Sequence, residues 1–218
     1  MENNELTPKQ RAQYIWDYYK LHIIGVLVLI ALAAWGINNY ILHPAPELCC
    51  GIAIYGPHIS AESVDALENT VTAQITSPDE NLTAEVDNFF FTEGQGSEDK
   101  LQDRNMLDKF YTYLYALQLD IFIGTKEDTL ACVKADFVET ADKYIPAEQM
   151  EAYEKDGRLL YGKDSDDKEQ MPYAVELKNS ALLKSMDILQ DDTYYICFIP
   201  VTGREERAKK AAQLFLGE

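Results

Sequence analysis

Few residues of this 218-residue chain have the types and spacing that catalysis requires. The three histidines, His22, His43 and His58, have no cysteine or second histidine at metal-ligand spacing. Asp164 opens an acidic run that is similar to a calcium loop, but Glu169 stands where such a loop needs glycine. The sequence also contains neither a Gly-x-Ser-x-Gly elbow nor a Walker motif. We therefore predict a non-catalytic protein with no metal and no cofactor.

Binding chemistry is better represented, at the ends of the predicted strands. In open α/β sheets, ligands bind beyond the carboxyl ends of the strands. The candidate ligand-binding residues at these ends are Tyr55, Gly56, Glu93, Gly94, Gly124 and Thr125. We interpret the glycines of Gly94-Gln95-Gly96 as turn residues, because Asp99 stands where a phosphate-binding fingerprint has its third glycine.

The charges near these strand ends indicate which ligand they would accept. Glu93, Glu98 and Asp99 lie close to the second turn, and Tyr55 lies at the first. Carboxylates accept hydrogen bonds and aromatic rings attract positive charge. We therefore expect a small cationic or hydroxyl-rich ligand, and we expect anions to be repelled.

Strands and helices alternate in the part of the chain that would carry this site. Apolar runs of strand length occupy residues 49–55, 86–92, 119–123, 158–161, 173–177 and 194–199. Helices are predicted after Ser60, over 97–118, after Thr125, over 146–155, and after the capping box Thr202-Gly203-Arg204-Glu205. Such alternation predicts an α/β fold: a single three-layer domain, residues 49–218, around a central, mostly parallel sheet.

The segment before this domain is typical of a membrane anchor. Residues 21–42 contain no Asp, Glu, Lys or Arg. As a helix they would span roughly 33 Å, against about 30 Å of bilayer hydrocarbon. The alternative is a signal peptide cleaved after Ala33, but apolar sequence continues through Leu42, so we predict an uncleaved transmembrane helix. The predicted membrane-anchor residues are Trp16, Tyr18, Tyr19, Lys20, Trp35 and Tyr40.

Charge divides the chain into two parts and predicts its orientation. Residues 1–46 carry three acids and three bases, so the net charge of −18 falls entirely on the remainder. So acidic a domain is not expected to bind nucleic acid. Lys9, Arg11 and Lys20 precede the span, and the next base is Lys100. The positive-inside rule then predicts a cytoplasmic or interfacial amphipathic helix over 1–20, a linker over 43–48, and an extracytoplasmic domain anchored in the cell membrane by a single pass.

The four cysteines, Cys49, Cys50, Cys132 and Cys197, leave two alternatives open. An extracytoplasmic compartment permits a disulfide, whereas free cysteines are usually buried as small apolar residues. Neighbouring residues of a strand point to opposite faces, so we expect at most one of Cys49 and Cys50 to face a given partner.

Several stretches resemble type 2 periplasmic solute-binding proteins. These are Gly51-Ile52-Ala53-Ile54-Tyr55, 119–124, 173–180 and 194–199 with the helix that follows. Trp16-Asp17-Tyr18-Tyr19-Lys20 is similar to uncharacterised single-pass membrane proteins of Firmicutes. A complete member of that family has two lobes, and the part of this chain that shows the resemblance is long enough for little more than one. The resemblance therefore implies one solute-binding-protein-like lobe. Two functions follow: a ligand- or peptide-binding sensor or accessory domain, or a structural subunit that binds another membrane or envelope protein.

Overall fold

The computed structural model of the chain describes residues 8–42, 44–90, 97–165, 169–178, 180–185, 193–201 and 203–217. The chain divides into two compact units, residues 1–45 and residues 46–218. The first unit is helical over its described residues 8–42, and the second contains every strand of the described structure.

The first unit is one long helix, α1 (Pro8–Gly36), which continues as a π-helix, η1 (Ile37–Leu42). Its segment Tyr18–Leu42 has 25 residues and a mean hydropathy of 2.1. It is therefore long and apolar enough to cross a membrane. The predicted anchor residues Trp16, Tyr18, Tyr19, Lys20, Trp35 and Tyr40 are all exposed along this helix.

The second unit is built on one six-stranded sheet with the order β2-β1-β3-β6-β5-β4. The strands are β1 (Glu47–Tyr55), β2 (Leu82–Phe89), β3 (Ile121–Gly124), β4 (Leu159–Gly162), β5 (Met171–Glu176) and β6 (Tyr195–Phe198). β2, β1 and β3 pair in parallel, while β6, β5 and β4 add to β3 through antiparallel pairings. Four of the six strands, β1, β2, β3 and β5, thus share one direction. The predicted α/β class and mostly parallel sheet are confirmed in this sense, but the antiparallel half was not foreseen.

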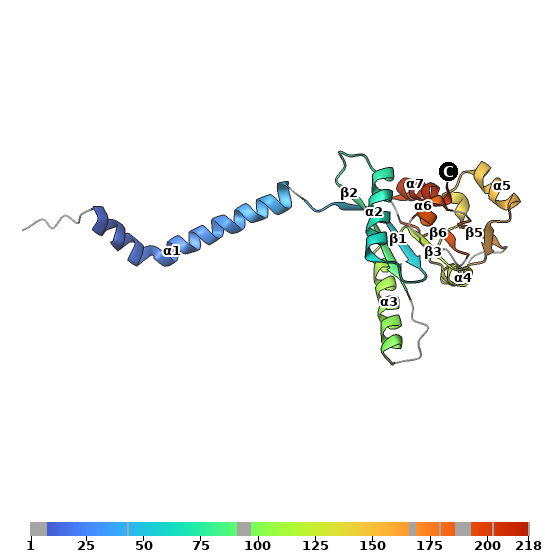
Figure 1. Cartoon of the computed structure of the whole chain (residues 1–218), viewed down its shortest axis with the longest axis horizontal. Coiled ribbons are helices and arrows are strands. Elements are labelled where there is room, and N and C mark those ends of the chain that lie inside the picture. The colour runs from blue at the N-terminus through green and yellow to red at the C-terminus, as the bar shows by residue number, and fades with distance from the viewer. Residues whose placement is uncertain are drawn as a thin grey trace, which may run out of the picture. The chain divides into compact units, whose positions relative to one another are not determined.

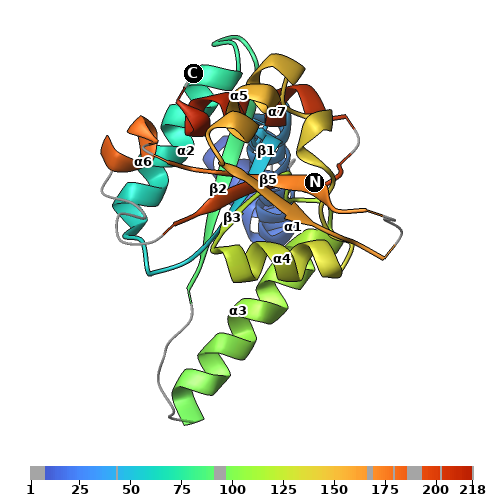
Figure 2. The same cartoon turned by 90° about the vertical axis from the view of Figure 1, so that its right-hand side faces the viewer.

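Helices cover both faces of the sheet (Figure 2). Those of the domain are α2 (Ala61–Ile75), α3 (Ser97–Tyr115), α4 (Lys126–Lys134), the 3₁₀ turn η2 (Ala141–Lys143), α5 (Ala147–Lys155), α6 (Ala181–Ser185) and α7 (Glu205–Leu216). Residues of α2, α5, α6 and α7 share one hydrophobic cluster, and residues of α3 and α4 share the other. The first turns of α3 extend beyond the sheet (Figure 1).

The strands supply both clusters because their side chains alternate. In β3, Ile121 and Ile123 belong to the cluster of α2 and α7, whereas Phe122 belongs to that of α3 and α4. This period of two is what an extended backbone dictates.

Cys49 and Cys50 break this alternation, and the expectation about them was wrong. Both are buried in the cluster of α2 and α7. The register between β1 and β2 shifts between Leu48 and Cys50, and such an irregularity turns neighbouring side chains toward one face. All four cysteines are buried, and none is paired in a disulfide.

Local signals located most helix starts correctly. The hydroxyl oxygen of Ser60 accepts a hydrogen bond from the Ser63 amide and caps α2. The last helix differs from its prediction, because its N-cap is Arg204 and Thr202 lies outside the described residues. Glu205 still accepts a hydrogen bond from the Gly203 amide at 2.9 Å, and the Arg204 side chain is held by another part of the fold.

Candidate functional site

A cavity of about 170 Å³ lies between α3 and α4, against β1 and β3. An apolar cavity of roughly 150 Å³ is known to hold one benzene molecule, so this one can hold one group of similar size. Its rim is accessible, because Leu107 and Tyr111 are 37% and 40% exposed. The lining residues are Tyr55, Leu107, Phe110, Tyr111, Phe122, Asp128, Ala131, Cys132, Ala135 and Phe137.

Three aromatic rings from three different elements form the inner wall. Tyr55 ends β1, Phe110 is on α3 and Phe122 is on β3. Their centroids are 5.6 Å apart for Tyr55 and Phe122, and 5.8 Å apart for each of the other two pairs. Each such contact is worth about 0.5–1.5 kcal/mol beyond area burial, so the rings fix one another.

A second aromatic group stands at the rim. The ring of Tyr111 lies 6.0 Å from that of Phe137, and Tyr115 lies 6.5 Å from the same ring. Tyr115 is 74% exposed, so this group continues from the cavity onto the surface of α3. Aromatic residues therefore line the cavity on several sides.

Asp128 is the one charged residue among the described lining residues. Thr125 caps α4 by accepting a hydrogen bond from the Asp128 amide at 3.3 Å, and its hydroxyl donates to Asp128 Oδ2 at 2.6 Å. This reciprocal pair fixes the carboxylate in the first turn of α4, where the helix dipole favours negative charge. None of the described side chains forms an ion pair with Asp128.

The charge of Asp128 acts on two neighbours in the cavity wall. Burial, and then the negative charge of Asp128, raises the pKa of Tyr55 far above its usual value. The same two causes raise the pKa of Cys132 to about 12. Both groups therefore stay protonated at neutral pH, so Cys132 is a poor nucleophile and Tyr55 carries an O–H donor.

The structure brings three of the six predicted site residues together. Tyr55 lines the cavity, and the parallel pairing of Ile54 with Ile123 places Gly124 and Thr125 at the same sheet end. A Cβ on Gly124 would lie 2.6 Å from the Phe122 ring, so this glycine leaves room for a lining side chain.

The remaining predicted residues are Gly56, Glu93 and Gly94. Gly56 is half-buried, and its amide donates to the Phe89 carbonyl at 3.2 Å. Glu93 and Gly94 lie outside the described residues, as does the segment 91–96 between β2 and α3. The side chains of Glu98 and Asp99 are also outside the description.

Sequence reasoning missed Phe110, Tyr111, Asp128, Cys132 and Phe137 as site residues. One signal was available in α3. It carries aromatic residues at 110, 111, 113 and 115, which is more than a single buried helical stripe can use. Nothing in the sequence places Phe137 opposite them.

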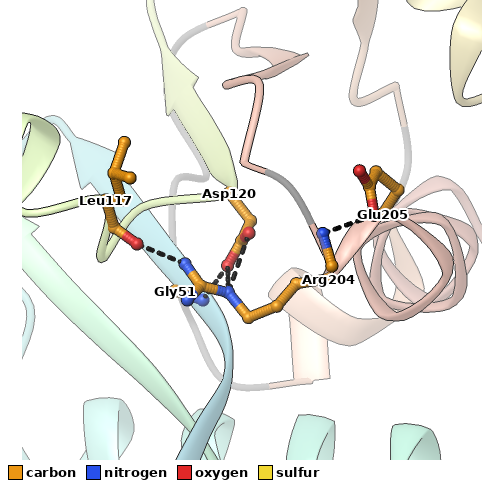
Figure 3. Close-up of polar contacts among 6 residues, drawn as sticks. Gly51, Leu117, Asp120, Arg204 and Glu205 are labelled. Carbon is orange, nitrogen blue, oxygen red and sulfur yellow. Dashed lines mark hydrogen bonds and ion pairs between the residues drawn. The ribbon is translucent and has the colours of Figure 1, made fainter.

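A second polar cluster lies at the other end of β3 (Figure 3). Asp120, 1% exposed, immediately precedes that strand. Arg204 Nε donates to Asp120 Oδ1 and Oδ2 at 3.1 and 3.0 Å, and the Gly51 amide donates to Oδ2 at 2.7 Å. Arg204 also donates from Nη2 to the Leu117 carbonyl oxygen at 2.6 Å.

This cluster is closed and needs glycine at position 51. A Cβ on Gly51 would lie 1.7 Å from the Gln118 carbonyl oxygen, so any side chain there would clash. Burial is the largest influence on Asp120 and raises its pKa, while the Gly51 amide and Arg204 lower it. We interpret the cluster as a structural connection between α7 and the sheet.

The described residues hold no group of three or more His, Cys, Asp or Glu side chains placed to bind a metal ion. Of the acidic run seen in the sequence, Asp164 accepts a hydrogen bond from the Tyr173 hydroxyl at 2.7 Å, while residues 166–168 lie outside the description. Comparison with known proteins found no matching family model, no matching curated protein and no matching solved structure.

Proposed function

We propose that this protein is a membrane-anchored, non-catalytic binding domain whose site is the cavity between α3 and α4. One observation carries the proposal: an accessible aromatic cavity with a fixed carboxylate lies where Tyr55 ends β1 and Gly124 ends β3. Ligands of open α/β sheets bind at this end of parallel strands.

We infer further that the N-terminus is cytoplasmic and that the domain is outside the cell. This rests on the bases before the span and the apolar length of Tyr18–Leu42. From the sequence resemblance alone, we also propose that the domain corresponds to one lobe of the solute-binding-protein type.

The location can be tested with introduced cysteines, because the four natural ones are buried. Glu62 is exposed on α2 of the domain, and Asn4 precedes the helix. A membrane-impermeant maleimide should label Glu62→Cys in intact cells and should label Asn4→Cys only after permeabilisation. The reverse pattern, or a mature protein cleaved after Ala33, would contradict the proposed topology.

Binding can be tested by filling the cavity. The full chain in a maltoside detergent is screened by thermal shift against small amines, sugars, phosphates and carboxylates. Ala131→Phe, at an exposed position of the cavity wall, should abolish any stabilisation seen with the wild type while leaving the circular dichroism unchanged. A flat response of the wild type to every compound would reject a small-ligand site.

One observation favours the alternative, a subunit that binds another envelope protein. Four large apolar residues on α3 and directly after it are exposed, namely Leu107, Tyr111, Tyr115 and Leu117. Exposed aromatic residues are enriched in protein interfaces. In a detergent-extract pulldown, loss of a captured protein by Tyr115→Ala, with ligand binding absent in the wild type, would support this alternative.

A further inference from the structure

We propose that the cavity between α3 and α4 binds a small organic ammonium ion, whose positive head is enclosed by aromatic rings and faces Asp128. This inference rests on the proposed binding function and specifies the ligand class of the same site.

Aromatic residues form two walls of the cavity. Tyr55, Phe110 and Phe122 form one wall, and Tyr111 with Phe137 forms another. Aromatic faces carry negative electrostatic potential and attract cations, and cages of such rings recognise quaternary ammonium groups. A lining of aliphatic side chains would have no such preference.

Asp128 is half-buried in the lining, and within the described structure its carboxylate accepts a hydrogen bond from the neutral hydroxyl of Thr125, which in turn accepts from the Asp128 amide. Contrast this with Asp87, whose charge is met by Lys109 Nζ at 2.6 Å. No described side chain supplies the positive charge that would balance Asp128, so a bound cation can do so.

The size and the surrounding field narrow the choice of ligand. A volume of about 170 Å³ suits one methylated ammonium head but not a sugar with several hydroxyl groups to satisfy. Tyr55 and Asp128 are the main polar groups of the wall, too few for a hydroxyl-rich molecule. The net charge of −18 on the domain also attracts cations and repels anions.

The test uses choline and its uncharged isostere 3,3-dimethylbutan-1-ol, titrated calorimetrically into the full chain. The protein is kept in a maltoside, because phosphocholine detergents and lipids carry the group being tested. We expect choline to bind at least tenfold more tightly than the isostere, and its affinity to fall as salt is raised.

Two variants of the cavity wall and one control variant outside it assign the effect to the cavity. Asp128→Asn keeps the side-chain shape and the oxygen that accepts from Thr125, and should weaken choline binding at least tenfold. Asp108→Asn removes one charge from the exposed surface of α3 outside the cavity wall and should change affinity less than twofold. Tyr111→Leu, which removes a rim ring but keeps an apolar side chain, should weaken binding several-fold.

The outcomes separate this inference from the proposed function. If the isostere binds as tightly as choline, or if Asp128→Asn and Asp108→Asn weaken choline equally, the ammonium assignment is wrong while the cavity remains a binding site. If neither choline nor any amine of the screen binds but a sugar, phosphate or carboxylate does, the inference fails alone. If no compound binds, both fail.

A last arm identifies the source of the ammonium group. The titration is repeated in nanodiscs of phosphatidylglycerol and of phosphatidylcholine. Equal choline affinity in both supports a free soluble ligand. Competition in phosphatidylcholine alone would reject a free ligand and assign the ammonium group to a lipid headgroup.

Discussion

The two ends of β3 each carry an aspartate, and the two aspartates have opposite surroundings. Asp120, before the strand, is buried and meets Arg204 and the Gly51 amide. Asp128, in the first turn after the strand, is half-buried and meets only Thr125 among the described residues. The first end is closed by its own chain, and the second opens into an aromatic cavity.

This difference shows which acid serves the fold and which is available to a ligand. A buried charge with an internal counter-ion is already neutralised and is not accessible to a ligand. Removal of its partner strongly destabilises the fold, because it leaves an unpaired charge buried. A partly accessible carboxylate without a counter-ion costs little to keep and can attract a cation. Four experiments test the contrast, beginning with the largest expected effect.

Arg204→Met should strongly destabilise the domain, because it leaves Asp120 buried without its counter-ion. The expected loss is about 3–5 kcal/mol in the free energy of unfolding. Urea unfolding of a fragment of residues 46–218 measures it, since this unit has its own core and should unfold in one cooperative transition. Lys143→Met, which removes the exposed partner of Glu139, should cost less than about 1 kcal/mol. Similar losses of stability in the two variants would mean that the ion pair of Arg204 with Asp120 is no more important to the fold than an exposed one.

The loss in the free energy of unfolding caused by Arg204→Met should become smaller as the pH falls. The pKa of Asp120 is already raised by burial, and loss of the positive charge that lowers it would raise it further. A group with a raised pKa binds more protons in the folded state, so stability falls as pH rises through the window above the unfolded value of about 3.9. The free energy of unfolding of the variant should therefore be closer to that of the wild type near pH 5 than near pH 7. A deficit that is constant over this range would show that lost packing, and not the unpaired charge, causes it.

Thr125→Ala should destabilise the domain by about 1 kcal/mol, the usual cost of losing an N-cap. It also removes the hydroxyl that holds Asp128, so the affinity for an ammonium ion should fall as well. Thr125→Ser keeps the hydroxyl and should restore most of both. If Thr125→Ser restores the stability but not the affinity for an ammonium ion, the helix cap and the ligand site do not depend on the same hydroxyl group.

Asp128→Asn should have the smallest effect on stability, about 0.3–1 kcal/mol from the lost charge at the helix N-terminus. Its effect on ammonium binding should nevertheless be large. Equilibrium unfolding and calorimetry on the same preparation compare the two. A stability loss as large as that of Arg204→Met would remove the distinction between the two ends of β3.

Much of the domain followed from local sequence. All six strands lie near their predicted positions, because an apolar run of strand length is readable from composition and spacing. The starts of α2 and α4 at Ser60 and Thr125 were also predictable, since a cap is formed between residues three positions apart. The apolar helical segment Tyr18–Leu42 followed in the same way from the absence of Asp, Glu, Lys and Arg over residues 21–42.

The strand directions and the sites needed the tertiary structure. The insertion of β6 between β3 and β5 is decided by packing between distant segments, which leaves no local pattern. Arg204 and Asp120 are 84 residues apart in the sequence, so their ion pair depends on the tertiary structure. The residues around Arg204 had indicated only a local capping box. The register shift that turns Cys49 and Cys50 to one face is a relation between two strands.

The cavity shows both sources together. The strand ends Tyr55, Gly124 and Thr125 were predictable, because parallel strands carry their carboxyl ends to one edge of the sheet. The aromatic residues of α3 and Phe137 were visible as residues but not as a wall. Only the packing of α3 and α4 over the same face decides that these rings and Asp128 line one cavity. Sequence determines which segments can be strands or helices because those preferences are local, whereas a site assembled from several segments depends on contacts that only folding creates.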